Sequence, residues 1–267
     1  ALEILHRRGM EYYEALMPAI VGSVCGYGGA AAARVVGLGP LWHFPRVLEL
    51  HPADFAWAVA AGVVGAIVAI AYTYMTIGLR RVVAGVPTGM RPALGGLLIG
   101  LGALVTPYAL TNGELQINDL LRHPVVVATL GVAAIAKLCS SAVAVVTGFR
   151  GGFIIPLFFV GFCLGRLTAG HLPGGNSMVL AAGLMVACNV GVTKTPLGST
   201  LVVTEMAGFA ILPTTLIAAM VSLVLTSEVA VIHSQQRRLS VDAPGASTNI
   251  DRSSDPGLER DLGPTPA

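Results

Sequence analysis

Long apolar stretches alternate along this chain with short charged or proline-rich segments. Five of the seven stretches have roughly the 20 residues that a helix needs to cross the hydrocarbon core of a bilayer, and two are shorter. The apolar stretches run over residues 15–33, 55–79, 92–112, 125–146, 153–165, 178–192 and 206–227. We therefore predict an all-α membrane protein without β-sheet, a bundle of roughly seven to nine helices, several of them tilted or broken.

Composition supports this class and argues against several others. The chain is 54% hydrophobic and 11% charged, with a mean hydropathy of +0.76. A net charge of +2, with no basic run among aromatic residues, does not suggest a nucleic-acid partner. Histidine and cysteine stand at no spacing typical of a metal site, and no Ser-His-Asp arrangement or nucleotide loop is present. We expect a membrane protein in contact with lipid that is not an enzyme and has no metal or cofactor.

The two ends of the chain differ from its apolar middle. Residues 240–267 are rich in Pro, Gly, Ser and Asp, a composition typical of disorder. We therefore divide the chain into a transmembrane domain over residues 1–239 and a disordered polar tail over residues 240–267, which we expect in the cytoplasm. The start at Ala1 lacks a signal-peptide pattern, and we interpret the chain as beginning inside a longer protein.

A glycine-rich break between two apolar segments lies at Thr147 to Pro156. The first N–H groups of a helix that starts inside a membrane lack partners and carry partial positive charge, and an anion satisfies both. Gly151 and Gly152 lack a Cβ, so the backbone there is able to turn sharply and approach a ligand. The alternative is that these glycines only let helices pack closely. Because Pro156 lies in the first turn of the next segment, we favour the discontinuous helix that transporters use at binding sites.

Two motifs resemble those of the CLC family of chloride channels and proton/chloride antiporters. Gly151–Pro156 is similar to the family's Gly-Gly-x-Phe-x-Pro signature, and Lys194–Met206 to its Arg-x-Pro-Leu helix that ends in Glu-Met. The resemblance extends from about Glu3 to Arg238 and corresponds to the second half of the family's inverted-repeat membrane domain. The first-half loops, Gly-Ser-Gly-Ile-Pro and Gly-x-Glu-Gly-Pro with its external gating glutamate, have no match in this sequence.

The resemblance implies a chloride site at this break. Chloride is the expected ligand, held by the backbone amides of Phe153 and Ile154, with Gly151, Gly152 and Pro156 shaping the turn. The family also has a side-chain donor near the start of its last helix, in most relatives a tyrosine.

His233 or Ser234 fills the place of that donor here. Each is able to donate a hydrogen bond, and a histidine would make anion affinity depend on pH. The resemblance leaves open which of the two is the donor.

Three further charged residues bear on the prediction. Lys137 lies at membrane depth, where a cation costs about 2.5 to 3.5 kcal/mol on insertion scales, so it should face protein or water. It either pairs structurally or contributes to the electrostatic environment of the anion. Arg150 lies inside the loop and either attracts anions or points into an aqueous vestibule. The resemblance places Glu205 in a structural role near a subunit interface.

The expected function is chloride transport through a CLC-type pore, channel-like or proton-coupled. Glu3 matches a conserved acid of the family, but Ile4 stands where proton-coupled members carry a second one, which favours passive or differently coupled transport. Phe153 and Ile155 replace the Glu and Thr of fluoride-exporting relatives, which favours chloride. Alternatives are a secondary transporter of another small anion with a broken-helix site, or a structural membrane subunit.

The small-residue first span and the helices between Pro196 and Leu225 resemble the family's interface helices and predict a homodimer. We expect it in the plasma membrane of a bacterium.

Overall fold

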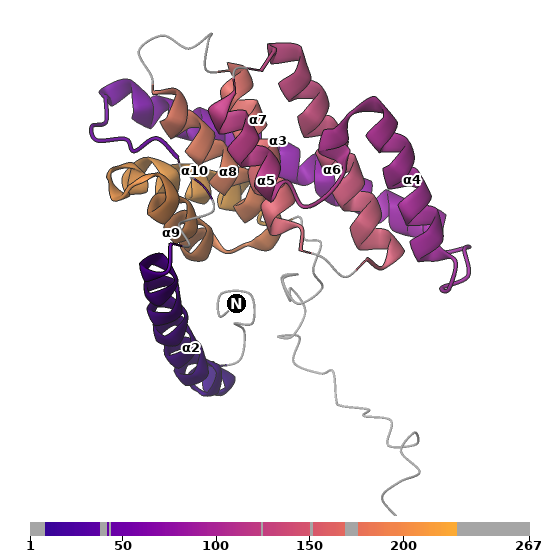
Figure 1. The fold of residues 1–267 in the computed structure, drawn as a ribbon, viewed down its shortest axis with the longest axis horizontal. Helices are drawn as coiled ribbons and strands as arrows, with labels where there is room; N and C mark the ends of the chain where they lie inside the picture. Colours follow the sequence, from indigo (N-terminus) through magenta and orange to yellow (C-terminus); the bar gives the residue numbers. More distant parts are fainter. Residues whose placement is uncertain are drawn as a thin grey trace, which may run out of the picture. The chain divides into compact units, whose positions relative to one another are not determined.

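The computed structural model describes residues 9–37, 42, 44–123, 125–149, 152–168 and 176–228, all of which belong to one compact unit. Within these ranges the chain is helical and contains no strand (Figure 1). The α-helices are α2 (Gly9–Val35), α3 (Pro52–Val83), α4 (Arg91–Val105), α5 (Glu114–Arg122), α6 (Val127–Thr147), α7 (Ile154–Thr168), α8 (Ser177–Thr193), α9 (Pro196–Ala207) and α10 (Leu212–Leu225). Short 3₁₀ turns, η1 (Pro107–Ala109) and η3 (Phe209–Ile211), precede α5 and α10.

Helix α8 is the centre of the unit. Every one of its residues from Met178 to Thr193 is buried, and α3, α7, α9 and α10 pack around it (Figure 1). Small residues make these contacts close. A Cβ on Gly65 of α3 would lie 2.3 Å from the Cβ of Ala187, and a Cβ on Gly161 of α7 would lie 2.5 Å from the Cα of Met185. Close approach through glycine is how helices gain contact in lipid, where apolar burial alone does not drive them together.

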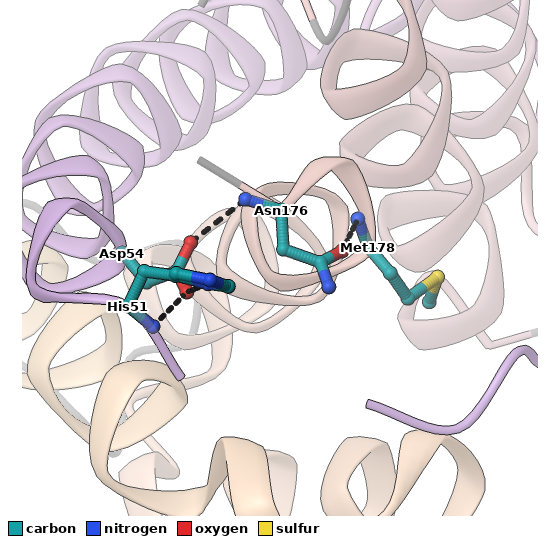
Figure 2. A network of polar contacts seen from close by, with 4 residues as sticks. All are labelled: His51, Asp54, Asn176 and Met178. Carbon is teal, nitrogen blue, oxygen red and sulfur yellow. Dashed lines mark hydrogen bonds and ion pairs between the residues drawn. The ribbon is translucent and has the colours of Figure 1, made fainter. Parts of the chain in front are cut away.

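A fully buried carboxylate joins the first turns of α3 and α8 (Figure 2). Asp54 Oδ2 accepts a hydrogen bond from the backbone N–H of His51 at 2.8 Å, and its Oδ1 accepts one from Asn176 N–H at 2.8 Å. Asn176 in turn caps α8, because its Oδ1 accepts from Met178 N–H at 2.9 Å. The sequence interpretation missed Asp54, although an acid three residues after a helix N-cap is the signal of a capping box.

Helix lengths are unequal, as the apolar pattern predicts. Only α3 and α6 among the described helices are both long and apolar enough to cross a membrane. Helix α4 has 15 residues, a length of about 22 Å, which is short of the roughly 30 Å hydrocarbon core. The apolar stretch 92–112 therefore contains a helix shorter than a full span.

One predicted span is wrong. Residues 206–227 do not form one span, because α9 ends at Ala207, Gly208 adopts a φ of +107°, and α10 begins only at Leu212. A backbone with positive φ does not continue a helix, and glycine adopts it without steric cost. Helix α3 extends beyond the apolar stretch 55–79 to Val83, and it carries Arg80 and Arg81 in its last turn, near the negative end of the helix dipole.

Candidate anion site

The predicted break is present between α6 and α7. Helix α6 ends at Thr147, Gly148 follows with a φ of +88°, and the Phe149 N–H bonds back to the Ala144 carbonyl at 3.1 Å. This is a left-handed helix end of the kind that glycine favours. Gly151 and Arg150 lie outside the described residues, so their predicted roles stay predictions.

The turn residue that the sequence interpretation missed is Gly148. Gly152 was expected to need a conformation that other residues resist, but its φ lies outside the left-handed region and nothing is within 4 Å of a Cβ built on it. Among the described residues of this break, Gly148 is the glycine that adopts a positive φ. A side chain at position 152 would therefore enter open space next to the helix start without the strain of a positive φ.

Helix α7 begins with its N–H groups open. The Phe153 carbonyl accepts the first bond of the helix, from Leu157 N–H at 3.0 Å. Among the described residues no acceptor is recorded for the N–H groups of Phe153 and Ile154, and Pro156, the third residue of α7, has none to offer. Gly152 is exposed and Ile154 is 40% exposed. The first amides of α7 are thus free to donate to an anion.

Helix α4 fixes the α6 side of the break. Gly95 lies against Thr147 so closely that a Cβ at position 95 would be 2.1 Å from Thr147 Oγ1. The next residue, Gly96, is 3.7 Å from the ring of Phe149 by the same measure. The last turn of α6 and the start of the loop therefore pack against Gly95 and Gly96 of α4.

Helix α3 fixes the α7 side. The ring of Tyr72 contacts the ring of Phe153, with centroids 6.5 Å apart and planes at 40°. Tyr72, which is 1% exposed, was not recognised from the sequence, where it is one aromatic residue within an apolar run.

Lys137 has the structural role that was one of its two predicted alternatives. It is fully buried, and its Nζ donates to the carbonyls of Leu110 and Thr111 at 2.6 and 3.2 Å and lies 5.1 Å from the centre of the Phe159 ring. It thereby holds the turn before α5 against α6 and α7. A contribution of its charge to the anion's environment stays a prediction.

A second break separates α8 from α9. Lys194 adopts a φ of +58° after α8, and its Nζ donates to Gly191 O at 2.7 Å and also to Thr226 O, so one ammonium satisfies carbonyls at the ends of two helices. Helix α9 then starts with Pro196 as its first residue.

Neutral polar side chains fill the space beside this second break. Asn189 Nδ2 donates to Ser199 Oγ at 3.0 Å, and the hydroxyls of Thr193 and Thr195 are 2.7 Å apart. Unlike the break at Gly148, this one turns at a residue other than glycine, Lys194, before Pro196 begins α9.

The predicted inner donor lies outside the described residues, so its role stays a prediction. His233 and Ser234, like Glu3 and Ile4, lie outside the described residues. The site that the structure assembles therefore consists of the α7 start with Gly152, Phe153, Ile154 and Pro156.

The apolar helices of this bundle break and begin again, and the N–H groups at the start of α7 have no acceptor among the described residues. These features define an α-helical membrane protein with discontinuous helices. The sequence model of the voltage gated chloride channel family matches residues 1–227. The chain belongs to this family, whose members are integral membrane proteins.

Individual relatives agree with this assignment. The chain is 30% identical over 190 residues to a voltage-gated ClC-type chloride channel of Citrobacter koseri, covering 67% of this chain and 45% of the relative. It is 34% identical over 141 residues to one of Salmonella typhimurium, covering 50% of this chain and 34% of the relative. The chain thus spans less than half the length of these two relatives.

A solved structure has the same fold. The crystal structure of a CLC-type fluoride/proton antiporter matches with a TM-score of 0.69 at 19% identity, covering 84% of this chain and 56% of the other. The prediction of a CLC-type half-fold is confirmed.

Proposed function

We propose that the protein transports chloride, or an anion of similar size, across a membrane, with the start of α7 as part of the anion site. The observation that carries this proposal is the helix start at Phe153 and Ile154, whose amides have no recorded acceptor within the described residues and whose approach at Gly152 is open. Aligned peptide dipoles give such a start a partial positive charge, which favours an anion.

Chloride is preferred over fluoride in this proposal. By the family resemblance, Phe153 and Ile155 replace the Glu and Thr of fluoride-exporting members. The two relatives described above are named chloride channels. The fluoride/proton antiporter is similar in fold only, so it does not indicate which ion this protein binds. Ile4 in place of a second acid supports passive or differently coupled transport.

A homodimer is the second part of the proposal. The glycine-rich face of α2 is unpacked in this chain, since nothing lies within 4 Å of a Cβ built on Gly22, Gly26, Gly28 or Gly29. Helix α9 exposes Leu197 and Leu201, 60% and 53% of their surface, beside the exposed Glu205. Small and apolar surfaces of this kind support close helix contact between subunits in lipid. Mass measurement in mild detergent tests this, and a monomer at every protein concentration would refute it.

The proposed setting is a bacterial plasma membrane with the C-terminal tail in the cytoplasm. Enterobacterial relatives support the first point. Arginines at the end of α3 support a cytoplasmic end for that helix by the positive-inside rule.

Anion flux from liposomes tests the transport function. The protein purified from its own membrane is reconstituted, and efflux of chloride is compared with efflux of an organic carboxylate and of phosphate. We expect chloride efflux well above that of protein-free liposomes. Efflux of the carboxylate or phosphate without chloride would instead indicate a transporter of another anion, and no anion efflux would indicate a structural subunit.

A variant pair ties the flux to the α7 start. Gly152→Val adds a side chain directly before the Phe153 and Ile154 amides, and we expect it to hinder the approach of the anion. Losing one hydrogen bond to a charged group weakens chloride binding by roughly tenfold or more. Gly100→Val is the control, because position 100 is also open within 4 Å but belongs to α4, one turn after Gly96, and not to the start of α7. Equal chloride affinity of the two variants in a calorimetric titration would remove the α7 start from the site.

The inner donor is tested by the same titration. His233→Ala and Ser234→Ala are compared, and we expect only the variant of the true donor to lose affinity, by about 1.5 to 3 kcal/mol. If neither changes chloride affinity, this part of the proposal is wrong.

A further inference from the structure

Tyr72 connects three helices at the candidate anion site. It lies on α3 with 1% of its surface exposed, and its hydroxyl is 3.3 Å from the hydroxyl of Ser141 on α6. Its ring contacts that of Phe153, the residue before α7. Leu157 of α7 and Val192 of α8 belong to the same buried cluster, so the ring is enclosed by protein.

The hydrogen bond between Tyr72 and Ser141 is unlike those of their neighbours. Hydroxyls in an apolar helix usually bond back to a carbonyl of their own helix. Thr73 does so on α3, donating to Ala69 O at 2.8 Å, and Ser140 does so on α6, donating to Lys137 O at 3.2 Å. The Ser141 hydroxyl instead meets the Tyr72 hydroxyl across the helix interface.

Filling space does not account for a tyrosine at this position. A buried hydroxyl without a partner is costly, and phenylalanine would pack the same ring without that requirement. What the hydroxyl adds is a fixed ring position, because the bond to Ser141 restricts how the ring slides against Phe153.

Fixing Phe153 matters because the backbone beside it is otherwise little constrained. Gly152 has no side chain and nothing within 4 Å of a Cβ built on it, so contacts on that side do not orient the Phe153 amide. The ring of Phe153 is half-buried and meets Tyr72. Holding the ring therefore holds the direction of the N–H group at the start of α7.

We propose that Tyr72, held by Ser141, is a positioning residue that sets anion selectivity by orienting the Phe153 amide. This inference rests on the proposed transport function. Oriented donors favour one anion size and geometry, whereas loosened donors adapt to several. Losing the Tyr72–Ser141 bond is thus expected to change discrimination between anions and to leave the fold intact.

The test measures the ratio of nitrate to chloride efflux from liposomes that contain the protein purified from its own membrane. Tyr72→Phe removes only the hydroxyl, and Ser141→Ala removes its partner. We expect each to change the ratio by about 2- to 10-fold in the same direction, the range that corresponds to one neutral hydrogen bond. The double variant is expected to equal the single variants, because they remove one shared interaction.

The chain offers matched controls. Tyr74→Phe changes a tyrosine of the same helix that is 61% exposed, and Ser140→Ala changes the serine next to Ser141. Both should keep the wild-type ratio.

The outcomes separate this inference from the function on which it rests. Wild-type protein that carries no anion would overturn both. Wild-type chloride efflux with an unchanged ratio in Tyr72→Phe and Ser141→Ala would overturn the positioning role alone, as would additive effects in the double variant. If Tyr72→Phe does not fold, Ser141→Ala and its control decide the question.

Discussion

Gly95→Ala tests how tightly α4 packs against the end of α6, next to the candidate anion site. The added Cβ would lie 2.1 Å from Thr147 Oγ1 and 2.7 Å from Thr147 Cβ, where ordinary contacts are 3.4–4 Å. Rotating the Thr147 side chain does not remove the second clash, because its Cβ does not move on rotation. The two helices must therefore separate, by at least about 0.7 Å at this point.

The expected size follows from the behaviour of overpacked cores. Adding one methyl group to a tight contact costs about 1 to 3 kcal/mol. For a protein of this length that lowers the unfolding temperature by roughly 2 to 12 °C. Because Thr147 directly precedes Gly148, where the chain leaves α6, the same displacement is expected to reduce chloride efflux.

Two neighbouring glycines serve as controls. A Cβ on Gly96 would make an ordinary contact of 3.7 Å with Phe149, and one on Gly100 would meet nothing within 4 Å. Alanine in a helix interior is favoured over glycine by up to about 1 kcal/mol, so both variants should match or exceed the wild-type unfolding temperature. A Gly95→Ala protein as stable as Gly96→Ala in the same detergent would refute the reasoning.

Three other variants test single contacts by their unfolding temperature. Gly148→Ala places a side chain at a φ of +88° and should cost about 1 to 2 kcal/mol, whereas an unchanged temperature would contradict the left-handed turn. Asp54→Asn should lower the free energy of unfolding by about 1.5 to 3 kcal/mol, because it weakens the junction of α3 and α8. Asp119→Asn changes an exposed acid and should have no effect. Similar losses of stability in both variants would argue against the capping role of Asp54. Lys194→Met leaves the Gly191 and Thr226 carbonyls without their ammonium partner and should destabilise by about 1 to 3 kcal/mol, and a stable variant would show that this contact contributes nothing.

The sequence by itself determined the class of fold and the approximate place of the first break, within Thr147 to Pro156, because the backbone preferences of glycine and proline act within a few residues. It did not single out Gly148 as the turn residue of that break. At the second break Pro196 begins α9, but the residue with positive φ is Lys194. Gly208 lies inside an apolar run and gave no composition signal strong enough to predict the break there.

Only the tertiary structure decided which distant residues meet. The sequence does not indicate that Asp54 bonds to Asn176, that Lys137 bonds to Leu110 and Thr111, or that Gly95 lies on Thr147. Tyr72 and Phe153 are likewise far apart in the chain and come together only because α3 and α7 both pack on α8. The physical reason is that apolar runs of similar composition are interchangeable in lipid, so their pairing depends on surface shape and on polar contacts that form after the helices have packed.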